Sequence, residues 1–152
     1  MKRRVLLVGL VIILVATTIG CGRATAQEPP SSIEIFNILK EAGVPVGEFI
    51  DHTEATDPNN LMNRPNQYIA KLDFEIIGVD QLHGPNGGSI EIFRTARDAR
   101  DRKDHIDRIG AAMPLFMETS EIFLDVVLIR IDSRVTHSDA QMFLDLIRER
   151  LE

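Results

Sequence analysis

The sequence predicts an α+β domain, a two-layer sandwich in which an antiparallel sheet of about four strands carries about three helices on one face. Apolar residues recur with helical spacing in three segments, and each of these segments follows a Ser or Thr suited to cap a helix. Between them the pattern changes to the alternation of strands that have one solvent-exposed face. The order helix, two strands, helix, two strands, helix is that of an α+β sandwich.

The first helix is predicted to begin at Ser31, because Glu34 follows at the spacing of a capping box. Gly43 is placed to end it, with Pro45 just beyond. Its apolar stripe consists of Ile35, Ile38, Leu39 and Ala42.

Two alternating segments then predict an antiparallel hairpin. From Tyr68 to Ile77 one side is apolar and the other carries Lys71, Asp73 and Glu75. Residues 83–88 form a turn-rich connection, and the alternation resumes from Ser89 to Arg94.

Thr95 caps a second predicted helix, whose outer face is the charged run 97–104 and whose inner stripe is Ala99, Ile106, Ile109 and Met113. Segments 116–123 and 125–132 are strand-like, and we expect the second, the more apolar of the two, to be the central strand. Thr136 caps the last helix, and its buried side is Ala140, Phe143, Leu144, Ile147 and Leu151.

The N-terminus has the order of a secretory signal. Three basic residues at positions 2–4 precede an apolar run from Val5 to Ala16. The tetrapeptide Thr18-Ile19-Gly20-Cys21 follows, and it resembles the lipobox of bacterial lipoproteins, with Thr18 where leucine is commoner. The resemblance implies cleavage before Cys21, the only cysteine, and lipid on its thiol. We therefore expect a signal peptide at 1–20, a flexible tether at 21–32 and one domain at 33–152.

Two alternatives stay open at this point. The apolar run is short of the roughly 20 residues of a transmembrane helix, so an uncleaved anchor is disfavoured. A cut near Ala24-Thr25-Ala26 would instead discard Cys21. With Cys21 retained, the protein is expected on the extracytoplasmic face of the cell membrane, with membrane lipid as its partner there.

The charge balance points away from nucleic acid. Loss of Lys2, Arg3 and Arg4 leaves 14 of the 17 basic residues against 23 acidic ones, a net charge of −9. Such a domain favours cationic partners and repels a phosphate backbone. The basic residues of segment 97–104 are interleaved with acidic ones, which is typical of a solvated helix face.

The loop at 53–67 is the most unusual segment, because it is long and rich in polar side chains. Long ordered loops often carry function, so we predict a recognition loop formed by Asp57, Asn59, Arg64, Asn66, Gln67 and Tyr68. A structured turn held by Asp57 and Asn59 is the alternative. The spacing excludes an EF-hand, whereas an irregular calcium loop using Asp51, Glu54, Asp57 and Asn59 stays open.

The stretch Thr56-Asp57-Pro58-Asn59-Asn60-Leu61, followed by Arg64-Pro65 and Tyr68-Ile69-Ala70-Lys71, resembles a family of small secreted proteins and lipoproteins of actinobacteria and related bacteria. In that family glycine tends to stand where this chain has Asn63 and Asn66, and asparagine tolerates the same left-handed backbone. The family has no assigned activity, so the resemblance implies none.

No motif predicts catalysis, a metal or a cofactor. His52, His83, His105 and His137 lack the spacing of metal ligands, and nucleophile motifs are missing. The expected function is therefore that of a non-catalytic binding module of the cell envelope, with an envelope protein as partner. A receptor for a small ligand or cation is one alternative, and an envelope hydrolase without a recognisable motif is another.

Overall fold

The computed structural model describes residues 29–79 and 87–152. Their order confirms the α+β class: α1 (Ser32–Glu41), β1 (Val46–Asp51), β2 (Ala70–Ile76), β3 (Gly87–Ile92), α2 (Ala96–Ala112), η1 (Pro114–Phe116), β4 (Thr119–Phe123), β5 (Val127–Ile131) and α3 (His137–Leu151). The sheet is antiparallel throughout, with strand order β1-β2-β3-β5-β4. The predicted hairpin is confirmed as β2 and β3, which pair from Ala70 with Ile92 to Glu75 with Gly87.

The expectation of about four strands misses β1. This strand lies at the edge of the sheet, its register against β2 shifts between Val46 and Phe49, and most of its residues are exposed. An edge strand with a bulge has no buried face to impose alternation, so the sequence carries no strand signal there. The expectation that 125–132 is the central strand is also wrong, because β3 occupies the centre and β5 lies between β3 and β4.

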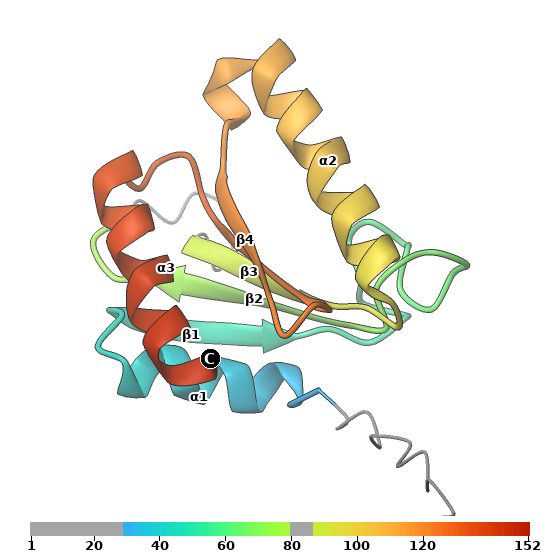
Figure 1. The fold of residues 1–152 in the computed structure, drawn as a ribbon, viewed down its shortest axis with the longest axis horizontal. Coiled ribbons are helices and arrows are strands. Elements are labelled where there is room, and N and C mark those ends of the chain that lie inside the picture. Colours follow the sequence, from blue (N-terminus) through green and yellow to red (C-terminus); the bar gives the residue numbers. More distant parts are fainter. Residues whose placement is uncertain (1–28, 80–86) are drawn as a thin grey trace, which may run out of the picture.

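The prediction that all helices share one face is wrong as well. α1 and α3 pack with the apolar side of the strands around Ile35, Phe74, Ile129 and Phe143. α2 lies across the opposite face, where Ala99 and Ile106 pack with Tyr68, Phe93 and Leu128 (Figure 1). The sheet therefore has helices on both faces, and the domain has three layers where α2 crosses it.

The C-terminal part of α2 extends beyond this contact. Ile109 and Met113, expected on its buried stripe, are 37% and 49% exposed. Gly110 is buried instead, because the chain after η1 passes close to it: a Cβ there would lie 3.1 Å from the Cα of Met117. Segment 116–123, expected as one strand, divides into the end of η1 and the shorter β4.

The predicted helix caps are confirmed. Ser31 and Glu34 form a capping box, and the hydroxyls of Thr95 and Thr136 accept from the backbone of Asp98 and Asp139. The N-cap of the first described helix is thus Ser31, as predicted. The predicted signal peptide, Cys21 and most of the tether lie outside the described residues. Within residues 29–79 and 87–152, no helix is long and apolar enough to cross a bilayer.

Candidate functional site: a groove at the open edge of the sheet

Two residues of the predicted recognition loop, Asp57 and Tyr68, lie inside the protein. Tyr68 is fully buried and Asp57 is 7% exposed. The Asp57 carboxylate accepts from the backbone N–H groups of Leu61 and Met62 at 2.7 and 2.9 Å, and from the Tyr68 hydroxyl at 2.8 Å. The two side chains hold the loop together and do not form its outer surface. Asp57 bonds to backbone amides as the structured-turn alternative expects.

The protonation states of this pair follow from its surroundings. Burial alone would raise the pKa of Asp57, but the N–H groups of Leu61 and Met62, together with the Tyr68 hydroxyl, hold that pKa at about 2. Burial raises the pKa of the Tyr68 phenol well above its usual range. Tyr68 therefore remains a hydrogen-bond donor and Asp57 an ionised acceptor. Asn59 completes the cluster through its side-chain amide, 3.3 Å from the Tyr68 hydroxyl.

The rest of the loop presents a polar outer surface. Arg64 and Asn66 are exposed and Gln67 is half-buried. Asn63 and Asn66 both have φ of 61°, which confirms that asparagine supplies the left-handed backbone of this turn. Leu61, Asn66 and Gln67 line a cavity of about 330 Å³ that Asp101, Arg102 and His105 of α2 complete.

The residues of the alternative calcium loop are bound to different partners. Asp51 accepts from the hydroxyl of Ser32, and Glu54 accepts from the amide of Asn63. Asp57 is saturated by the bonds described above. Across residues 29–79 and 87–152 the structure gathers no set of three His, Cys, Asp or Glu side chains that would hold a metal ion.

The covered half of the sheet face beneath α2 contains an ion network that the sequence did not predict. Glu91 on β3 is completely buried. Arg102 of α2 binds it with two hydrogen bonds of 2.9 and 3.0 Å, and Arg130 of β5 adds one of 2.8 Å. Arg130 in turn forms a bidentate pair with Glu118, at 2.6 and 2.8 Å. Each charge is paired, as buried charges must be.

Burial and pairing act in opposite directions on the pKa values in this network. Burial opposes the charge of Glu91, but the hydrogen bond from Arg102 and the positive charge of Arg130 lower its pKa below the usual value. Burial likewise opposes the charge of Arg130, while its hydrogen bonds to Glu118 and the charge of Glu91 raise its pKa. Glu91 and Arg130 therefore stay ionised at neutral pH. The network fixes α2 to the sheet and has no free group for chemistry.

β4 forms an open edge of the sheet. Phe93 N–H donates to the carbonyl of Val126, so even-numbered residues of β5 bond to β3 and odd-numbered ones bond to β4. The corresponding partners on β4 are Thr119, Glu121 and Phe123. The backbone N–H and C=O groups of Ser120 and Ile122 therefore point away from the sheet, and no backbone partner for them occurs in the described chain.

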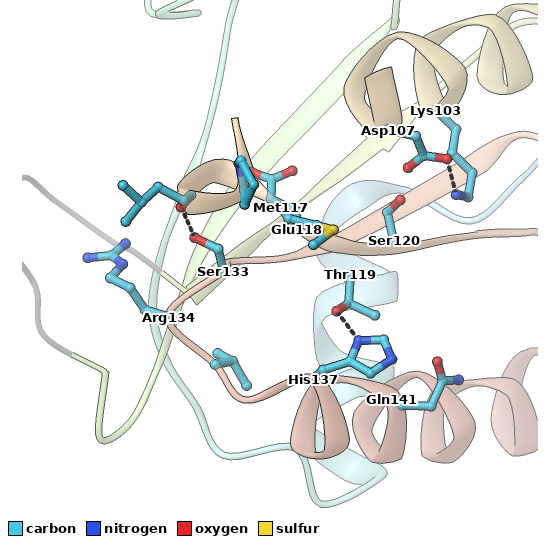
Figure 2. Close-up of a pocket in the computed structure, with 13 residues that line it drawn as sticks. Lys103, Asp107, Met117, Glu118, Thr119, Ser120, Ser133, Arg134, His137 and Gln141 are labelled. Carbon is cyan, nitrogen blue, oxygen red and sulfur yellow. Dashed lines mark hydrogen bonds and ion pairs between the residues drawn. The ribbon is translucent and has the colours of Figure 1, made fainter. Parts of the chain in front are cut away.

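This open edge borders a groove between α2 and α3, with a cavity volume of about 760 Å³ (Figure 2). Lys103 and Asp107 of α2 form one wall, and His137 and Gln141 of α3 form the other. Figure 2 shows Ser120 pointing toward α2 and Thr119 toward His137, to which it hydrogen-bonds at 3.2 Å. The Ser120 Oγ is buried, and the described residues offer it no hydrogen-bond partner.

Exposed apolar side chains flank the groove at one end. Leu115 is 86% exposed, Phe116 61%, Met117 58% and Met113 49%. We refer to these four residues as the apolar ridge. Exposed apolar residues scattered singly are ordinary, whereas a contiguous group beside a groove indicates a binding surface. The sequence does not indicate this ridge, because Met113 and Phe116 fit the patterns of a buried stripe and of a strand.

A histidine and a hydroxyl, those of His137 and Thr119, lie in contact in the groove. A catalytic pair also needs a third group that orients the histidine. No carboxylate of the described chain hydrogen-bonds to His137. The groove thus combines free backbone groups of β4 with apolar side chains and with charged ones such as Lys103 and Asp107.

The fold and the groove define a small α+β domain with a helix-flanked open sheet edge. In comparisons with protein-family models, with curated proteins and with solved structures, no family model, protein or structure matches this chain.

Proposed function

We propose that this protein is a lipid-anchored, extracytoplasmic binding module of the cell envelope, and that its partner is an extended segment of another envelope protein that adds to β4. The observation that carries the proposal is the free backbone of Ser120 and Ile122 at the groove between α2 and α3. Strand addition of this kind takes its affinity from main-chain hydrogen bonds and its specificity from side-chain contacts beside the strand.

Three further features support this partner. The apolar ridge would contact apolar side chains of the segment, and the buried Ser120 hydroxyl would gain a partner. The chain carries 23 acidic against 17 basic residues, which favours a segment with basic side chains. Open sheet edges are normally protected against pairing with other chains. The edge strand β1 is protected by its bulge and by two exposed acidic residues, Glu48 and Asp51. The charged residue in the middle of β4, Glu121, is paired with Arg148 and is therefore not free to protect the edge in this way.

The position of the groove suits a tethered protein. The start of α1, to which the tether is joined, and η1 lie at opposite ends of the domain (Figure 1). With lipid on Cys21, a flexible tether joined to α1 would leave the groove accessible to another envelope protein. The exposed loop residues Arg64 and Asn66 are the second candidate surface, favoured by their rigid turn.

Affinity purification from solubilised membranes after crosslinking tests the proposal. The double variant Leu115→Asp/Phe116→Asp should lose the crosslinked partner, because two charges would stand in the apolar contact. Met142→Asp is the matched control, since Met142 is 50% exposed on α3 but does not line the groove. Unchanged recovery with the double variant, together with loss in Arg64→Ala, would assign binding to the loop instead.

A further inference from the structure

A second, smaller cavity lies on the part of the sheet face that α2 leaves uncovered. Its volume is about 220 Å³, and its lining is made entirely of polar residues and glycines. We refer to it as the hollow. Its polar lining includes the side chains of Asn59, Lys71, Asp73, Ser89, Arg130 and Asp132. The ridge side chains, which carry the proposed partner contact, do not line it.

The register of the sheet explains the hollow. Ser89 of β3 pairs with Asp73 on one side and with Arg130 on the other, so three side chains form a row across the face. The middle member of this row is small, whereas Arg130 beside it is long. Gly87, two positions before Ser89 on the same strand and therefore on the same face, adds no side chain above the floor. The hollow is therefore the space over Ser89.

Polar groups in the hollow have hydrogen-bonding capacity that the protein does not use. Ser89 is only 6% exposed, and its hydroxyl has no partner in residues 29–79 and 87–152. Lys71 is 4% exposed, and its ammonium has three N–H donors but one described acceptor, the Asp73 Oδ2 at 2.9 Å. That same oxygen also receives His52 at 2.8 Å, which leaves the Asp73 Oδ1 without a described donor. These atoms are reachable from the hollow, because among the described residues Ser120 Oγ alone is a fully buried side-chain atom without a partner, so a ligand in the hollow can pair with them.

The charges in the hollow select the class of ligand. Lys71 is paired with Asp73, Arg130 with Glu118 and Glu91, and Asp132 with Arg134. An anion would meet the carboxylates of Asp73 and Asp132, and a cation would meet Lys71 and Arg130. These charges disfavour both kinds of ion. The hollow presents hydrogen-bond donors and acceptors side by side, and a hydroxyl group can pair with both because it donates and accepts.

We propose that the hollow binds an uncharged polyhydroxylated ligand the size of one sugar ring, with its hydroxyls on Ser89, Lys71 and Asp73. The volume agrees with this size, since drug-sized ligands occupy roughly 300 to 1,000 Å³. None of the described lining residues is aromatic, so hydrogen bonds would provide the affinity. This site is independent of strand addition at β4, and either can fail without the other.

Ligand-observed saturation-transfer NMR on the full chain in detergent micelles tests the proposal. The probes are glucose, galactose, mannose, arabinose and N-acetylglucosamine, with phosphate, acetate and ethanolamine as charged comparisons. We expect transfer to at least one neutral sugar and weaker or no transfer to the charged probes. Transfer to none of the sugars, or stronger binding of a charged probe, would overturn the proposal.

Two variants locate the binding. Ser89→Ala removes the unpartnered hydroxyl and should weaken the sugar about fivefold to tenfold, the factor for one hydrogen bond. Ser89→Val fills the hollow and should abolish binding. Valine is favoured in strands, so this second variant should keep the fold of β3. Ser138→Ala, an exposed serine on α3, is the matched control. Equal affinity in all three variants, with unchanged melting temperatures, would show that the sugar binds elsewhere and would refute this site.

Discussion

The guanidinium of Arg102 lies over the ring of Tyr68, with its Cζ 5.8 Å from the ring centroid. The same guanidinium holds the buried Glu91, and the Tyr68 hydroxyl holds Asp57. α2, the loop at 53–67 and the centre of the sheet are thus joined through two side chains. A contact of this type contributes about 0.5 to 2 kcal/mol. It is one of the contacts that hold α2 on the face opposite to the one occupied by α1 and α3.

Asp57 makes the loop sensitive to acid. Its pKa is about 2 in the folded protein, below the unfolded value of roughly 4, so its stabilising contribution is present above pH 4 and is lost as the pH falls toward 2. The shift corresponds to about 2 kcal/mol. Urea unfolding should show Asp57→Asn less stable than wild type by about this amount at neutral pH, with the gap closing near pH 2. The exposed Asp125→Asn is the control. A gap that stays constant with pH would contradict the account.

Glu91 is predicted to be the most sensitive charge of the domain. Glu91→Gln leaves Arg102 and Arg130 with a buried partner that carries no charge, and removal of one member of a buried pair typically costs about 3 to 5 kcal/mol. Asp101→Asn, which breaks an exposed pair with Arg97, should change stability by less than about 1 kcal/mol. Chemical denaturation measures both. Similar small losses in the two variants would show that the network is not a main support of α2.

Cys21 is predicted to carry the membrane anchor. In cells, Cys21→Ser should lose incorporation of a labelled fatty acid and should leave the membrane fraction, because the lipid chains provide the binding. Mass spectrometry of the wild type should find Cys21 at the mature N-terminus. A Cys21→Ser protein that stays in the membrane would favour the uncleaved anchor, and a mature chain beginning at Gln27 would favour the cut after Ala26.

Local signals in the sequence were sufficient for the parts of the fold that depend on neighbouring residues. The caps at Ser31, Thr95 and Thr136 and the alternation through β2 are set within a few positions, so they were predictable. The edge strand β1 was not, because a bulged strand exposed on both faces has no period.

The site depended on distant residues. Lys71, Glu91 and Arg130 occupy the polar side of alternating strands, where the sequence indicates contact with water. They are enclosed only because α2 and the loop at 53–67 fold over that side, which brings Arg102 against Glu91 from eleven residues away. The resemblance over residues 56–71 identified a segment that the structure shows to be held by Asp57 and Tyr68. It gave no sign of the groove at β4.

A photoreactive amino acid placed singly at Leu115, Arg64 or Met142 in the full chain tests the central claim most directly. All three positions are exposed. Irradiation of intact cells should yield a crosslinked envelope protein from position 115 beside the groove, and no adduct of that protein from positions 64 and 142. An adduct from position 64 alone, or from none of the three, would contradict binding at the open edge of β4.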